Sequence, residues 1–252
     1  MEFEHKDPKF EKLDEHTLLL FAGDSLIQRE IADRVKNKAF QTASIKISER
    51  LKRRLAPASK IKPIHEIAKI TADVFEELRL EKIEKEYFLT RKISMNEFYR
   101  EGKINQFPAQ LAAVIDQQSQ TASLGSEVLV TGVDSRGSHI HYINERHTNR
   151  NFDRIGFHAI GIGAVHALSS FLGDKYHSSL PFSCALYTVY KAKKRAEAAP
   201  GVGELTDMLV INPSGTQSIN LDKLKELYDA ERHKIEEESS EIKNIPDEIL
   251  LR

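Results

Sequence analysis

Apolar residues in the middle of the chain follow the short spacing that is typical of strands. Three runs rich in β-branched residues, 127–134, 138–144 and 155–160, are separated by polar segments, which predicts three strands with turns between them. The third run continues through Gly161-Ile162-Gly163 into the apolar segment 164–172, where we predict a helix. This order indicates a sheet with helices packed on it.

The residues before this region alternate between strand and helix patterns. Lys9–Leu13 alternates as a strand does, and the apolar run 17–22 predicts a buried strand. Asp24 and Ser25 then stand where a helix cap is expected. A longer amphipathic helix is predicted after Pro63, and its apolar stripe comprises Ile64, Ile67, Ala68, Thr71, Val74, Phe75 and Leu78.

The residues after 172 predict two further helices and a pair of strands. Pro181 is expected to open a helix that reaches about Ala199. Strands are predicted at 207–211 and 217–220, before a charged final helix at 221–239. The inner face of the Pro181 helix is predicted to comprise Phe182, Ala185, Leu186, Val189 and Ala192.

Strands in antiparallel groups, with helices between the groups, favour the α+β class over a doubly wound sheet. We expect two stacked sheets with a helical layer on each side. Neither an internal repeat nor a low-complexity linker is present, so we predict one domain over residues 1–252, with a helical insertion around residues 81–120.

Composition and charge exclude several functional classes for this chain. The formal net charge of −1 gives no general attraction to nucleic acid or to a membrane. The single cysteine excludes an internal disulfide and fits a reducing compartment, and neither a signal peptide nor a bilayer-spanning run is found. We therefore expect a soluble cytoplasmic protein that binds neither nucleic acid nor membrane.

Several short patterns have a functional and a simpler structural interpretation. Gly161-Ile162-Gly163 lacks the third glycine of a dinucleotide-binding loop, so close packing is favoured and no cofactor is expected. His139 and His141 share one face of a strand, as two metal ligands would, but surface histidines with Ile140 and Tyr142 inward are favoured, and no metal site is predicted. The basic clusters 50–54 and 191–195 are interpreted as solvated helix faces.

Four stretches resemble, in the same order, the proteasome-type branch of the N-terminal-nucleophile (Ntn) hydrolases. They are the strand pair Lys9–Asp14 and Leu18–Asp24 ending in Ala-Gly, the strand Val128–Asp134, the Gly-x-Gly turn in Ala159–Ala164, and the Gly-rich turn Gly201–Gly203 with Thr206 and Asp207. The resemblance implies a four-layer α/β/β/α sandwich, hydrolysis of amide or peptide bonds, and assembly into homo-oligomers through helical layers.

The resemblance also assigns roles to two residues. In such enzymes a Thr, Ser or Cys at the start of the mature chain attacks the amide carbonyl, and its own α-amino group acts as the base. By position, Lys9 matches the buried lysine that lowers the pKa of the nucleophile. Gly23 matches the glycine whose backbone N–H supports the oxyanion.

Two regions differ from the family pattern, and the first is the N-terminus, where the family's first two strands, which carry the nucleophile, would precede Lys9. No Thr, Ser or Cys occurs among residues 1–8, and Ala199 and Val202 stand where the family has the Asp and Ser that assist the amino group. The sequence therefore leaves two hypotheses. Either the full gene product supplies a nucleophile upstream and the protein is a peptidase-like hydrolase, or it is a non-catalytic assembly or scaffold subunit.

Ser25 offers a second, different chemistry. Gly23-Asp24-Ser25-Leu26 resembles the Gly-Asp-Ser-Leu block of a family of serine esterases, in which the Ser is the nucleophile and an Asp-x-x-His supplies the acid and base. Asp174 and His177 have that spacing, although the family's Gly-x-Asn-Asp block is missing. The simpler interpretation is that Asp24 or Ser25 caps a helix.

Overall fold

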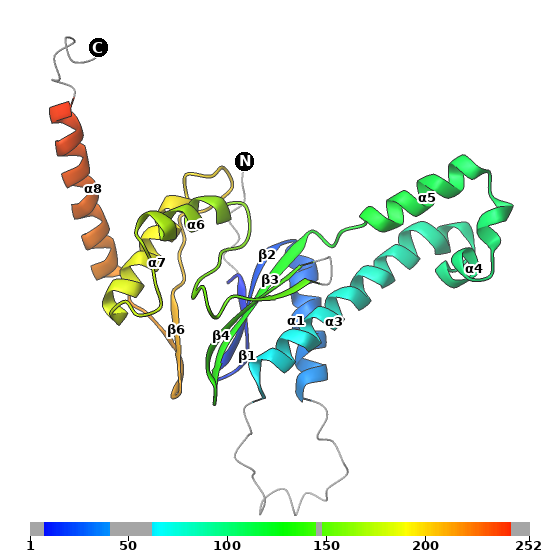
Figure 1. Ribbon diagram of the computed structural model, residues 1–252, viewed down its shortest axis with the longest axis horizontal. Helices are drawn as coiled ribbons and strands as arrows, with labels where there is room; N and C mark the ends of the chain where they lie inside the picture. The colour runs from blue at the N-terminus through cyan, green and yellow to red at the C-terminus, as the bar shows by residue number, and fades with distance from the viewer. Residues whose placement is uncertain (1–7, 41–61, 145–147, 243–252) are drawn as a thin grey trace, which may run out of the picture. The chain divides into compact units, whose positions relative to one another are not determined.

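A computed structural model describes residues 8–40, 62–144 and 148–242, with side chains to residue 239. Helices combine with antiparallel strands, so the α+β class is confirmed (Figure 1). The chain forms two compact units. The first comprises most residues up to Gly161 together with Ile211–Thr216, and the second comprises Ile162–Val210 and the residues from Gln217 onward.

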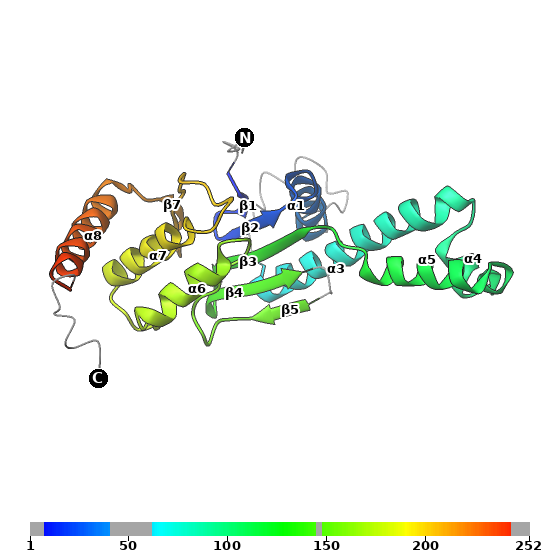
Figure 2. The same ribbon diagram turned by 90° about the horizontal axis from the view of Figure 1, so that it is seen from above.

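The first unit is built on a five-stranded sheet. Its strands lie side by side in chain order and every neighbouring pair is antiparallel (Figure 2). Tight turns join β1 to β2 and β3 to β4, as the sequence predicts. The strands are β1 (Phe10–Asp14), β2 (Thr17–Gly23), β3 (Ser126–Asp134), β4 (Gly137–Asn144) and β5 (Thr148–Asn151).

Two helices pack on one face of this sheet and form the main core. Helix α1 (Ser25–Phe40) and helix α3 (Ile64–Ile83) contact each other, and α3 lies along β3 and β4. Strand residues such as Leu19, Val130 and Ile143 point into this core because alternate residues share a face. The predicted stripe of α3 is confirmed: all seven of its residues are buried.

Beyond the sheet, α3 continues into a helical arm. A π-helical turn (Glu84–Phe88) and a 3₁₀ turn (Leu89–Arg91) follow it directly. The chain returns through α4 (Met95–Tyr99), a second 3₁₀ turn (Lys103–Gln106) and α5 (Ala109–Thr121). The arm has its own small core, comprising Ile83, Phe88, Phe98, Ala112 and Ile115.

A partly buried capping box fixes the bend of the arm. Ser94 Oγ accepts a hydrogen bond from Glu97 N at 3.1 Å, and Glu97 Oε2 accepts one from Ser94 N at 2.7 Å. These reciprocal bonds start α4 and satisfy two backbone donors of its first turn. Phe98 is thereby directed onto Phe88, with 5.3 Å between ring centroids.

The second unit contains α6 (Ala164–Gly173), α7 (Phe182–Ala196) and α8 (Asp222–Ile242). Strands β6 (Leu209–Asn212) and β7 (Gly215–Ser218) pair as a hairpin that divides between the two units. None of the helices in the described part of the chain combines the length and apolar character that a bilayer span requires.

The predicted inner face of α7 is largely wrong. Of the predicted residues Ala192 is buried, but Phe182 and Val189 are exposed by 62% and 40%, and the other buried residues are Thr188, Tyr190 and Ala196, which were not predicted. The helix therefore turns a stripe with small and hydroxyl-bearing residues inward. Hydrophobicity alone did not identify this stripe, because Thr188 satisfies its hydroxyl within the helix on Cys184 O at 2.9 Å.

The third strand predicted for the central region also differs from the structure. Residues 155–160 form no strand, and β5 lies earlier, at Thr148–Asn151. Phe152 N donates to Ile140 O at 2.8 Å, and then Ile155 N and Gly156 N both turn back to Phe152 O. This turn takes the apolar run out of the ladder before it can pair with β4.

Thr17 provides a test of the core. Its hydroxyl is fully buried and finds no hydrogen-bond partner in the described part of the chain. Because an unsatisfied buried hydroxyl costs free energy, we expect Thr17→Val to raise the free energy of unfolding by about 1 kcal/mol. Chemical denaturation measures the change.

The matched control is Thr71→Val. Thr71 is equally buried, but its hydroxyl donates to Ile67 O at 2.8 Å, so this substitution removes a hydrogen bond and leaves stability unchanged or lower. A loss of stability in Thr17→Val as large as in Thr71→Val would contradict this account of the Thr17 hydroxyl.

Candidate functional site

The two residues assigned by the Ntn resemblance lie at the open end of the β1–β2 hairpin. Phe21 N donates to Lys9 O at 2.8 Å, and Gly23, two residues further along, ends β2. The fold therefore brings Lys9 and Gly23 to the same end of neighbouring strands. The side chain of Lys9 is exposed in this unit, unlike the buried lysine of the resembling enzymes.

Gly23 has a packing role of its own. Its φ is +106°, and an added Cβ would lie 1.9 Å from Gly125 O. Asp24 N donates to the same Gly125 O at 3.0 Å, which holds the start of α1 against the loop before β3. Only a glycine permits this approach of two backbones.

A carboxylate that the sequence analysis did not single out lies beside this end of β2. Glu127 pairs with Ala22 in the β2–β3 register. Its Oε1 accepts a hydrogen bond from Tyr142 OH at 2.6 Å, and its Oε2 accepts one from Gly161 N at 3.1 Å. Burial and the bond to Glu127 both raise the pKa of Tyr142, so its hydroxyl stays protonated.

Glu127 thereby joins three of the stretches that carry the resemblance. It lies at the start of β3, opposite the Ala-Gly end of β2, and it holds the first glycine of the Gly-x-Gly turn. Gly161 has a φ of +84°, and an added Cβ would lie 3.0 Å from Ala22 Cβ. The one sequence signal for this contact is a charged residue opening an apolar strand.

The esterase hypothesis for Ser25 receives little support from the geometry. Ser25 is the first residue of α1, and Asp24 Oδ1 accepts a hydrogen bond from Leu26 N at 2.9 Å, so the capping interpretation is confirmed for Asp24. Asp174 accepts from Lys191 at 3.1 Å and Arg195 at 3.2 Å, while His177 Nδ1 bonds Ser179 Oγ at 2.9 Å. The proposed acid and base are thus engaged with other partners.

The basic cluster 191–195 is neutralised within the second unit. Lys191 also pairs with Glu231 at 2.9 Å, and Lys193 and Lys194 both pair with Glu197 at 2.6 Å. These side chains are only partly exposed, so the cluster differs from the solvated face that was predicted, and its internal pairing does not fit a nucleic-acid site either. The cluster 50–54 lies outside the described residues.

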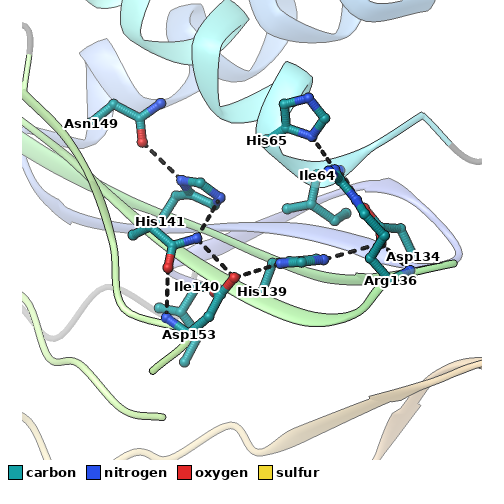
Figure 3. A network of polar contacts seen from close by, with 10 residues as sticks. Ile64, His65, Asp134, Arg136, His139, Ile140, His141, Asn149 and Asp153 are labelled. Carbon is teal, nitrogen blue, oxygen red and sulfur yellow. Dashed lines mark hydrogen bonds and ion pairs between the residues drawn. The ribbon is translucent and has the colours of Figure 1, made fainter. Parts of the chain in front are cut away.

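The prediction that His139 and His141 are surface residues is wrong. Both lie on the sheet face that packs against α3, and His141 is only 6% exposed. His141 Nδ1 bonds Asn149 Oδ1 at 2.9 Å, which ties β4 to β5 (Figure 3). Opposite His139 in the register stands Gly132, whose missing side chain leaves room for the end of α3.

Asp134 is the centre of the polar network in Figure 3. Its side chain is 3% exposed and accepts from Ile64 N at 3.0 Å, from Arg136 N at 2.8 Å and from His139 Nε2 at 3.0 Å. Burial opposes the charge, but these bonds outweigh it and lower the pKa of Asp134 to about 2. The carboxylate therefore stays ionised and caps α3.

Chemically, the network contains acceptors and imidazoles but no nucleophile. Among the residues described, no three His, Cys, Asp or Glu side chains are grouped so that they would hold a metal ion. The candidate for amide chemistry is therefore the other end of the sheet, where Lys9, Gly23 and Glu127 lie.

Comparison with known proteins adds no assignment: no family model matches the chain, and no curated protein matches it.

The packing role of Gly23 can be separated from any role in chemistry. We expect Gly23→Ala to lower the free energy of unfolding by about 1–3 kcal/mol more than a control at a position with the same backbone strain but open space. That control is Gly137→Ala, where φ is +125° and no atom lies within 4 Å of the added Cβ. Its cost should be about 1–2 kcal/mol.

Denaturant unfolding of both variants measures the difference. Equal losses would mean that the loop at Gly125 moves away without cost, and that Gly23 is free for another role.

Proposed function

We propose that this chain is a proteasome-type Ntn-hydrolase-fold protein with a four-layer α/β/β/α sandwich. The observation that carries the proposal is the meeting of three resembling stretches at one end of the sheet. The Ala-Gly end of β2, the start of β3 and the Gly-x-Gly turn contact one another through Glu127 and Gly161.

The proposed activity is hydrolysis of amide or peptide bonds. A Thr, Ser or Cys at the start of the mature chain would attack the carbonyl, with its α-amino group as base. The Gly23 backbone N–H would support the oxyanion, and Lys9 would lower the pKa of the nucleophile. The positive φ of Gly23 and the position of Lys9 just before β1, with its carbonyl bonded to Phe21 N, support this arrangement.

The first test identifies the nucleophile. Intact mass and N-terminal sequencing of the protein from its native source give the mature first residue. We expect Thr, Ser or Cys, and labelling of that residue by a covalent probe for N-terminal nucleophiles. A mature chain that starts with another residue would reject the hydrolase and leave the assembly role described below.

The second test concerns Lys9. In the active mature protein we expect Lys9→Ala to lower turnover by about 100-fold, because removal of the charge raises the pKa of the nucleophile. The matched control is Lys12→Ala in β1, three residues further along, since Lys12 is an exposed lysine that pairs with Glu15 at 3.0 Å. Turnover in a peptide-hydrolysis assay should be unchanged in the control; equal turnover in both variants would remove Lys9 from the site.

A non-catalytic assembly subunit is the second candidate, and a separate observation favours it. Val165 and Leu172 on α6 are 72% and 71% exposed and lie seven residues apart, on one face of the helix, and Ile162, just before the helix, is 72% exposed. A run of exposed apolar side chains of this kind marks a surface that another protein covers. This surface supports self-association as a homo-oligomer.

Oligomeric state tests the assembly role. We expect Val165→Glu combined with Leu172→Glu to shift the protein toward monomer in analytical ultracentrifugation, because two charges would be buried in the contact. The matched control is Leu89→Glu in the helical arm, where the leucine is 57% exposed. Unchanged assembly in the double variant would exclude the α6 surface.

A further inference from the structure

We propose that His139 acts as a proton-dependent clamp that holds the edge strand β5 and the residues after it to the sheet, and that releases them as the pH rises. This inference concerns regulation of the fold and is independent of the proposed hydrolase function.

The geometry around the ring defines its charge in the closed clamp. His139 Nε2 lies 3.0 Å from Asp134 Oδ1, and Nδ1 lies 2.6 Å from Asp153 Oδ2 (Figure 3). An ionised carboxylate only accepts hydrogen bonds, so both ring nitrogens must donate. A ring with two N–H groups is an imidazolium, and the clamp in this form therefore carries a proton.

The two carboxylates belong to different parts of the sheet. Asp134 ends β3 and caps α3 through Ile64 N. Asp153 follows β5, accepts from Ile140 N at 2.8 Å, and accepts from Asn151 Nδ2 at 2.8 Å. His139 on β4 is thus the side chain that joins the cap of α3 to the segment beyond β5.

The protonation of the His139 ring depends on every charged or titratable group that faces it. Asp134 and Asp153 supply two negative charges. Arg136 in the β3–β4 turn lies 3.7 Å from Asp134 and is more than half exposed, and it also contacts His65 Nδ1 on α3. On β4, His141 reaches the same network through Asn151 Nδ2, at 3.4 Å from its Nε2. Arg136 is partly exposed and offsets the charge of one carboxylate at most. The protonated ring of His139 offsets the charge of the second carboxylate.

Loss of a proton from His139 would break its hydrogen bond to one of the two carboxylates. A neutral imidazole has one N–H, so one carboxylate would face a ring lone pair. Each carboxylate keeps two other donors, Ile64 N and Arg136 N for Asp134, and Ile140 N and Asn151 Nδ2 for Asp153. Asp134 is 3% exposed and Asp153 is 26% exposed, so water can replace the His139 bond at Asp153 but not at Asp134. The contact between His139 and Asp153 is therefore the one that is lost, which weakens the hold on β5, whose four residues are mostly exposed.

The sign of the pH dependence follows from the pKa. Burial lowers the pKa of His139, but the hydrogen bonds to Asp153 and Asp134 outweigh burial and raise it above the ordinary value. A raised folded pKa means that the clamp contributes fully below about pH 6.5 and is lost as the pH rises through the folded pKa. The clamp therefore releases β5 as the pH rises through the folded pKa of His139.

Two measurements on the unmodified protein test the clamp. A ¹H–¹⁵N titration of the imidazoles should give His139 a pKa above about 6.5. Amide-exchange protection of β5 and Asp153, corrected for the intrinsic pH dependence of exchange, should fall through the same pH range. The fall should be about tenfold for each pH unit by which the folded pKa exceeds the ordinary one.

His139→Gln and Asp153→Asn locate the effect. His139→Gln keeps a neutral donor and cannot titrate, so β5 protection should be lower at pH 6 and flat with pH. Asp153→Asn should bring the pKa of His139 down while the protection at Ile64 is retained through Asp134. The control His166→Gln changes an exposed histidine on α6 and should leave the β5 profile as in the unmodified protein.

The proposal is wrong if the pKa of His139 lies at or below the ordinary histidine value. It is also wrong if the amide-exchange protection of β5 is the same on both sides of that pKa. A fall in protection that persists in His139→Gln would also overturn it, because another group would then control the segment. Should a variant fail to fold, the titration and exchange of the unmodified protein still decide between these outcomes.

Discussion

The docking of the α3 N-terminus on β3 is the contact on which the rest of the first unit depends. Ile64 sits over Gly132, where an added Cβ would come within 2.6 Å of Ile64 Cδ1 and 2.4 Å of His16 O. Two residues on, Asp134 accepts the Ile64 backbone N–H. A residue without a side chain and a residue with a short carboxylate thus fix both the depth and the direction of the helix.

Once docked, α3 determines the positions of two other parts of the first unit, the core above the sheet and the helical arm. Its buried stripe forms the core above the sheet together with α1, and its far end carries the helical arm. The same Asp134 that caps it also accepts from His139, so the start of the helix is linked to the edge of the sheet. One carboxylate therefore contacts both the start of the helix and the β3–β4 hairpin, and it is linked to the segment after the edge strand through His139 and Asp153.

The sequence predicts those features that rest on local pattern. The α3 stripe, the start of that helix after Pro63 and the cap at Asp24 follow from spacing and capping chemistry, and the structure confirms them. The faces of β4 and α7 could not be predicted this way. Alternation groups His139 with His141, but only tertiary pairing with Gly132, Asp134 and α3 decides which side is inward.

The candidate site likewise has a part that sequence order predicts and a part that depends on tertiary contacts. Sequence order places Lys9, Gly23 and the Gly-x-Gly turn in a consistent series. The strand register sets Glu127 opposite Ala22, and the bond from Gly161 N to Glu127 brings the turn to this end of β2. Glu127 was not predicted, because its role depends on a hydrogen bond to Gly161, 34 residues away. Contacts between distant residues of this kind leave no periodic signal.

The arm has a thermodynamic consequence of its own. Its aromatic core and the core above the sheet are separate clusters that have α3 in common. Cooperativity between them must pass through one helix, and it weakens at the π-helical turn, where the regular ladder of backbone bonds is interrupted. We therefore expect the arm to open as a foldon of its own, so that probes in the arm and probes in the core above the sheet report different free energies of unfolding.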